Sequence, residues 1–203
     1  MKPKQMERLT RHFDRYFGQT NNHVLHPIVD NGFHVDVLLY EPTETYPFWK
    51  LATMGASDYK MPKAQPTFGL YNEYVMFVDR GEDLGDKRVA AWYYGQLVRI
   101  ASYAKFCDTH VTYGHSLEWE PEDPEDEMMA AFLELPQIIP DGGILHCRLG
   151  LLRTVTCLQV VLLNKAELGR LMEIGPQAFS EYLYPEEKGK KHFLSERHRT
   201  EKF

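Results

Sequence analysis

Residues 154–163 restrict the possible folds of this chain more than any other segment, and they read Thr-Val-Thr-Cys-Leu-Gln-Val-Val-Leu-Leu. The run is long, rich in β-branched side chains and apolar at both alternating sets of positions. This pattern predicts a strand that is buried on both faces and therefore lies at the centre of a sheet. Asn164 follows directly, and Glu167 comes three residues later. That spacing predicts a capping box, which begins a helix immediately after the strand.

The rest of the chain alternates between helical and strand patterns. Residues 4–17 and 87–106 carry apolar side chains at helical spacing, and Gly175-Pro176 is expected to break the helix after Asn164 and to precede a second short helix. Strands are predicted at 34–41, 47–54, 72–79, 113–119, 128–135 and 143–149, the first two as a hairpin. Because the two kinds of element do not alternate strictly, we expect an α+β (mixed α/β) fold with a mixed sheet flanked by helices, and no doubly wound parallel sheet.

The length of 203 residues predicts one domain, which we place at residues 1–184. From residue 185 to 203 the sequence is charged and poor in aliphatic side chains. We therefore expect a loosely ordered C-terminal tail there.

Composition narrows the possible partners. The net charge of −6 argues against a nucleic-acid partner, since nucleic-acid binders usually present a basic face. Cys107, Cys147 and Cys157 have no metal-ligand spacing and are expected to be free thiols in a reducing compartment. The chain contains no signal-peptide pattern and no apolar run long enough for a membrane span. We expect a cytoplasmic protein with no membrane contact.

A serine hydrolase is one alternative that the sequence raises. Gly55-Ala-Ser57-Asp58-Tyr59 resembles half of a nucleophile elbow, but Tyr59 occupies the position that needs a second glycine. His34, His115, Asp36 or Asp58 would have to complete a triad, and spacing alone does not place them together. The favoured interpretation is that Ser57 and Asp58 bond their own backbone and shape a turn.

A metal-dependent enzyme is the other catalytic alternative. His23 and His26 are three residues apart, while His34 and Asp36 are two apart and would point to the same side of a strand. The pair could reach one ion, but a structural contact that holds the imidazole in one tautomer is favoured. We predict no metal and no cofactor, and no phosphate-binding glycine loop is present. Whether this His/Asp group binds a metal stays open at this point.

Residues 118–127 contain seven carboxylates and two prolines. Without buried neighbours these carboxylates are not expected to do acid–base chemistry. A solvated acidic loop can instead steer a basic protein partner and raise its association rate.

The chain resembles the suppressor of fused family in five ordered elements that span about residues 30–184. The resemblance begins with the motif His34-x-Asp36, a Pro42-Thr43 turn, Thr53-x-Gly55-x-Ser57 and Met61. It continues with Asn72-Glu73-Tyr74-Val75, the helix carrying Trp92 and Leu97, Gly114-His115, and Leu162-Leu163 followed by Glu167-Leu168.

This resemblance implies a mixed α/β domain that binds proteins and has no catalytic activity. Animal members are cytoplasmic regulators of Hedgehog signalling that clamp a transcription-factor peptide as an added strand between two domains. This chain has room for only the first of those domains. Short bacterial members look like immunity proteins that neutralise a toxin, and this is the function we expect. A regulator of a transcription factor remains an alternative, and the oligomeric state stays open.

The resemblance also indicates a partner-binding surface. It places Asp36, Thr53, Ser57, Asp58, Glu73 and His115 there. Asp36, Ser57 and Glu73 would supply hydrogen bonds or charge, and His115 would orient a strand or the partner.

Overall fold

The computed structural model describes residues 1–20, 23–26, 32–63, 69–184 and 192–199. A single mixed sheet in the order β1-β2-β3-β4-β8-β6-β5 forms its centre, and β7 pairs with β8 outside this path. The strands are β1 (Val24–Leu25), β2 (Asp36–Tyr40), β3 (Trp49–Met54), β4 (Asn72–Val78), β5 (Ser116–Glu118), β6 (Met128–Glu134), β7 (His146–Arg148) and β8 (Thr154–Asn164). Among the strands named here, which lie within the described residues, only β4 and β8 pair in parallel, so the predicted α+β fold is confirmed.

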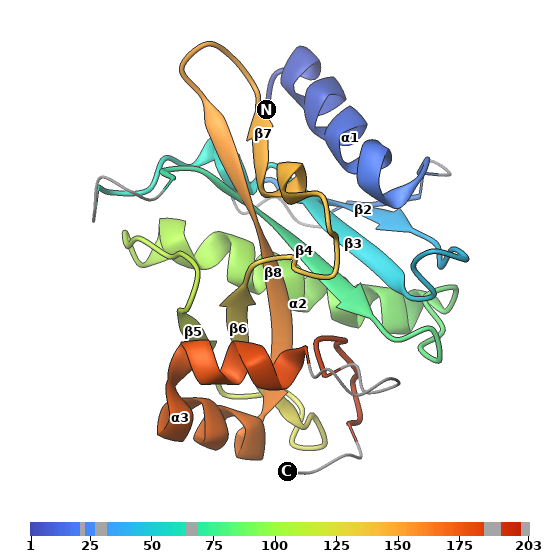
Figure 1. The fold of residues 1–203 in the computed structure, drawn as a ribbon, viewed down its shortest axis with the longest axis vertical. Helices are drawn as coiled ribbons and strands as arrows, with labels where there is room; N and C mark the ends of the chain where they lie inside the picture. Colours follow the sequence, from blue (N-terminus) through green and yellow to red (C-terminus); the bar gives the residue numbers. More distant parts are fainter. Residues whose placement is uncertain (21–22, 27–31, 64–68, 185–191, 200–203) are drawn as a thin grey trace.

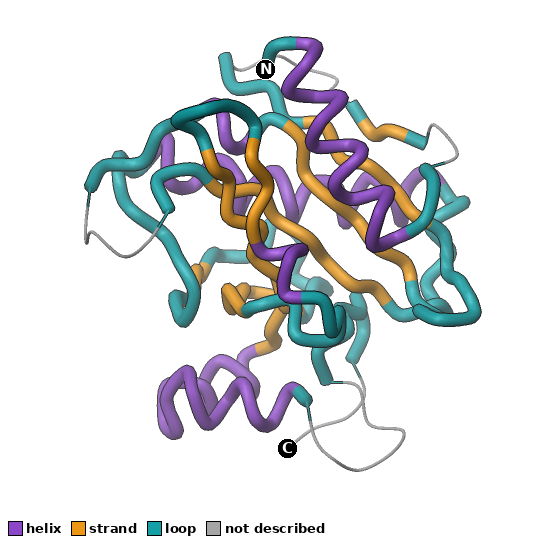
Figure 2. Tube along the Cα trace, turned by 45° about the horizontal axis from the view of Figure 1, so that its top comes forward, coloured by secondary structure: helices purple, strands orange, loops and turns teal. Residues whose placement is uncertain are grey.

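Helices cover both faces of this sheet (Figures 1 and 2). The helix α2 (Lys87–Phe106) packs on one face, while α1 (Pro3–Phe17) and α3 (Lys165–Leu183) lie on the other. Side chains of β2 alternate between the two layers: Val37 and Leu39 face α2, whereas Leu38 and Tyr40 face α1. No helix in the described ranges has both the length and the apolar character needed to cross a bilayer.

The strand β8 occupies the central position that its sequence predicts. Thr156 pairs with Asn72 of β4 on one edge and with His146 of β7 on the other. Further along, Val160 pairs with β4 and β6 in the same way, so one long strand joins both halves of the sheet. The capping box is also present: Asn164 Oδ1 accepts from the amide of Glu167, and Glu167 Oε2 accepts from the amide of Asn164, both at 2.9 Å.

Several element boundaries differ from the sequence prediction. The predicted strand 143–149 begins as a 3₁₀ turn, η2 (Gly142–Leu145), and only His146–Arg148 form β7. The strand β1 was not predicted, because its two residues are defined only by pairing with β2. The helix α3 is interrupted at Gly175, whose φ of 81° is non-helical, as the Gly175-Pro176 pair predicts.

The predicted loosely ordered tail is wrong for residues 192–199, and the rest of it, 185–191 and 200–203, lies outside the described residues. The buried residues Phe193 and Leu194 pack against the α1 side of the sheet. Ser195 bonds two neighbouring strands: its amide donates to the carbonyl of Phe77 in β4 at 2.7 Å, and its Oγ accepts from the amide of Leu162 in β8 at 3.1 Å. The high charge of the tail as a whole concealed this short apolar pair.

The buried Arg199 fastens this C-terminal segment. It forms an ion pair with Glu167, which is also buried, and it donates to the carbonyl oxygen of Leu194. Glu167 therefore serves both the cap of α3 and the attachment of the segment 192–199.

We predict that Arg199→Met lowers the free energy of unfolding by about 3–5 kcal/mol, because it leaves the Glu167 carboxylate buried without its charged partner. Arg170→Met is the control, since the Arg170–Glu173 pair is exposed and its loss should cost less than about 1 kcal/mol. Urea denaturation of both variants measures the difference. Equal, small losses would show that the segment is not held by this pair.

Candidate functional site

The turn after β3 is the centre of the site that the sequence motif indicates. It consists of Gly55 and the short 3₁₀ helix η1 (Ala56–Asp58). Gly55 has a φ of 125°, and a Cβ there would lie 2.4 Å from the carbonyl oxygen of His34. Only glycine fits both the backbone conformation and this close approach.

The carboxylate of Glu73 holds this turn from inside the sheet. Its Oε1 accepts from the amides of Gly55 and Ser57, both at 3.0 Å, and from Ser57 Oγ at 2.7 Å. Its Oε2 accepts from Thr53 Oγ1 at 2.7 Å and from the amide of Ala56 at 3.2 Å. Five donors therefore converge on one side chain of β4.

Glu73, Thr53 and Ser57 are all fully buried. Burial raises the pKa of Glu73, and the hydrogen bonds from Ser57, Thr53 and Gly55 oppose that rise. A buried carboxylate with five donors shapes the backbone but offers nothing to a partner. In the free chain these three side chains face inward, and their contact with a partner stays a prediction.

Ser57 also departs from the favoured sequence interpretation. Its hydroxyl bonds Glu73, which is 16 residues away in the chain, and not its own local backbone. Among the described interactions, no histidine nitrogen is hydrogen-bonded to Ser57 Oγ. These residues therefore do not form the serine–histidine pair that a hydrolase of this type requires.

The outer side of the turn is charged. Asp58 forms ion pairs with the amino group of Met1 and with Arg153, whose Nη2 lies 3.0 Å from Asp58 Oδ1. Arg153 also donates to the carbonyl oxygen of Ser57, and its guanidinium lies 4.9 Å from the centre of the Tyr71 ring. Asp58 is thus the part of this turn that reaches the surface, with one third of its side chain exposed.

Arg153 connects this turn to the hairpin of β7 and β8. The hairpin extends past the sheet beside the N-terminus of the chain (Figure 1), and its carbonyl oxygen at Arg153 accepts from the amide of Leu149 at 2.9 Å. At the tip, Leu151 and Leu152 are 89% and 99% exposed. Sequence reasoning missed this apolar tip, although a leucine pair after Gly150 between two strand patterns was a usable signal.

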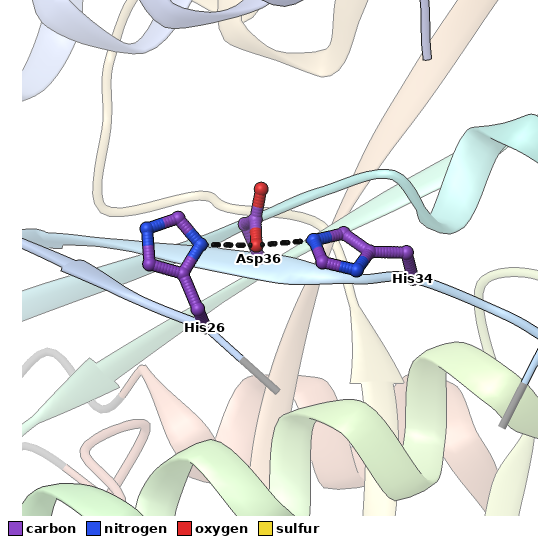
Figure 3. A group of neighbouring side chains, drawn as sticks. All are labelled: His26, His34 and Asp36. Carbon is purple, nitrogen blue, oxygen red and sulfur yellow. Dashed lines mark hydrogen bonds and ion pairs between the residues drawn. The ribbon is translucent and has the colours of Figure 1, made fainter. Parts of the chain in front are cut away.

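Asp36 lies in a second polar group, with His26 and His34 (Figure 3). Asp36 Oδ1 is 2.7 Å from His26 Nδ1 and 2.9 Å from His34 Nε2. The predicted contact between His34 and Asp36 is therefore present, and His26 joins it from the neighbouring strand. No spacing in the sequence predicted that His26 would join this pair.

His115 lies apart from both groups. It directly precedes β5, and its carbonyl oxygen accepts from the amide of Leu133 in β6 at 2.9 Å. Within the described part of the chain, no hydrogen bond or ion pair joins its side chain to Glu73 or Asp36. The six residues that the motif indicates therefore form no single pocket.

Comparison with known proteins now gives the family. The family model described as "Suppressor of fused protein (SUFU)" matches residues 32–197 of this chain. The chain belongs to the suppressor of fused family. This confirms the resemblance seen in the sequence, and the match extends into the C-terminal segment that packs on the sheet. No curated protein matches the sequence.

Solved structures of the family share this fold. A structure of a Sufu–Fu complex superposes with a TM-score of 0.66 at 11% identity and covers 98% of this chain and 93% of that one. A SUFU homologue from Neisseria gonorrhoeae gives 0.66 at 10% identity, with 98% and 96% covered. Suppressor of fused from Drosophila gives 0.67 at 12% identity; all of this chain is covered, but only 53% of the Drosophila chain. This chain thus spans about half of the Drosophila protein.

We predict that Glu73→Gln lowers the free energy of unfolding by about 3 kcal/mol. The NH₂ group of the glutamine side chain would replace one acceptor oxygen, and this donor would then face other hydrogen-bond donors. Chemical denaturation measures the loss. Glu41→Gln, a change at an exposed residue, is the matched control and should stay within about 0.5 kcal/mol of the wild type. A Glu73→Gln protein as stable as the control would show that the five donors do not depend on the carboxylate.

Proposed function

We propose that this chain is a non-enzymatic protein-binding domain, and that it serves as a bacterial immunity protein that neutralises a toxin domain. Membership of the suppressor of fused family supports the binding role, since one solved relative is a complex of Sufu with Fu. The similarity to the Neisseria gonorrhoeae homologue over nearly its whole chain is consistent with a bacterial member of this length.

The observation that carries the binding role is the apolar tip of the β7–β8 hairpin. Leu151 and Leu152 are adjacent and almost fully exposed, which is costly for a surface that stays in water. The tip rests on rigid supports, because Arg153 ties its base to Ser57 and Asp58. A partner that covers the two leucines would also meet the charged pair of Asp58 and Arg153 at the rim, in the arrangement of an apolar centre with a polar border.

The acidic loop between β5 and β6 would act on the approach of the partner, before the two proteins dock. Residues 118–127 lie at the opposite end of the molecule from the hairpin tip (Figure 1). Together with the net charge of −6, this loop favours approach of a basic partner such as a nuclease toxin. We assign docking to the hairpin; the loop and the net charge attract a basic partner to the molecule as a whole.

The test of docking is the double variant Leu151→Asp/Leu152→Asp. Tagged wild-type chain is used to capture partners from the native lysate, and the captured protein is identified and expressed alone and together with the chain. We expect a basic protein that stops cell growth when alone and is neutralised by co-expression. The double variant should bind this partner at least 100-fold more weakly, because two leucines that the partner would cover are replaced by charged side chains.

Met172→Asp is the matched control, since Met172 is also an exposed apolar residue, 73% exposed, but lies on α3. It should leave the affinity unchanged. If the double variant binds as tightly as this control, the hairpin is not the docking surface; if the captured partner is harmless to cells, the immunity role is wrong while the binding role stands.

A further inference from the structure

The group formed by His26, His34 and Asp36 lies at the outer edge of the sheet, and strand register places it there. Val24 pairs with Leu38 and Leu25 with Val37, so the next position along the ladder sets His26 opposite Asp36. His34 precedes Asp36 by two residues, which puts both side chains on the same face of the strand. The three side chains therefore meet because of backbone pairing, without help from any distant segment.

The two imidazoles approach one carboxylate oxygen from opposite sides (Figure 3). His26 Nδ1 and His34 Nε2 lie 2.7 and 2.9 Å from Asp36 Oδ1, and one donor atom from each residue lies within 4.8 Å of the other two. Ligand atoms around a tetrahedral Zn²⁺ are roughly 3.3 Å apart, given bonds of about 2.0–2.1 Å. To admit the ion, each imidazole nitrogen would move about half an ångström away from Asp36 Oδ1, and the two nitrogens, now within 4.8 Å of each other, would come to roughly 3.3 Å.

Exposure makes that movement feasible. The side chains of His26 and His34 are 63% and 54% exposed, whereas that of Asp36 is only 6% exposed. The carboxylate is thus a fixed ligand at the base, and the two rings above it are free to adjust. Their exposure also leaves room for water in the fourth position, as in zinc sites with three protein ligands.

We propose that His26, His34 and Asp36 form a binding site for a divalent transition-metal ion, with Zn²⁺ as the representative ion. Two imidazole nitrogens and one carboxylate oxygen suit such ions, whereas Mg²⁺ and Ca²⁺ prefer oxygen ligands alone. With both imidazoles neutral, the group carries one negative charge that favours a dication. In the metal-free chain the inner nitrogens donate to the Asp36 carboxylate. When the ion binds, each imidazole takes the other tautomer, with its proton on the outer nitrogen, and the inner nitrogens become ligands.

This site does not depend on the proposed partner. It is tested on the full chain, purified without a histidine tag and treated with chelator. Zn²⁺ is titrated by calorimetry, and Co²⁺ is added separately so that its visible absorption spectrum reports the coordination geometry. We expect one ion per chain and a Co²⁺ spectrum typical of four ligands that include nitrogen.

Single substitutions identify the ligands. His26→Gln and His34→Gln should each weaken Zn²⁺ binding at least tenfold, since each removes one of three ligands. His23→Gln is the matched control, because His23 is an exposed histidine of the same segment that is outside the group; its affinity should equal that of the wild type. Thermal unfolding of each apo variant checks that the fold is retained.

Absence of one-to-one binding in the wild type would overturn the proposal. So would equal weakening by His23→Gln, which indicates adventitious binding to surface histidines, or undiminished binding after both ligand substitutions. Asp36→Asn adds a third ligand test, and if that variant does not fold, the two exposed histidines still decide the result.

Discussion

The buried carboxylate of Glu73 is the interaction on which the candidate site depends. It is supplied by a strand buried on both faces, and it gathers five donors from the end of β3 and the turn after it. Buried charge is tolerated only when it is well bonded, so the turn has little freedom to adopt another shape. Gly55 completes the constraint, because its backbone passes against the carbonyl of His34.

This support explains why most of the motif is internal. Thr53, Ser57 and Glu73 set the path of the chain, and the residues they position are the ones that face solvent. Asp58 and Arg153 are held at the rim, and Arg153 in turn fixes the base of the hairpin that presents Leu151 and Leu152. A rigid interior under an exposed apolar tip lowers the entropy lost when a partner docks.

Local patterns predicted much of the fold. The helix 87–106, the central strand before Asn164 and its capping box depend on periodicity and on residues three positions apart, and all are confirmed. Contacts between residues far apart in the chain could not be predicted from these local patterns. Arg153 meets Ser57 across 96 positions, and His26 joins Asp36 only through strand register. The motif placed Glu73 near Ser57 by resemblance, but no periodicity revealed that its carboxylate points inward.

The central claim is that the rim and the hairpin tip meet the partner while the Glu73 network stays inside. Hydrogen–deuterium exchange of the chain, alone and in complex with the captured partner, tests this most directly. The account predicts new protection on binding at residues 149–153, and unchanged, already strong protection of the amides of Gly55, Ala56 and Ser57. Protection that appears only at β5 or α3, with residues 149–153 unchanged, would contradict it.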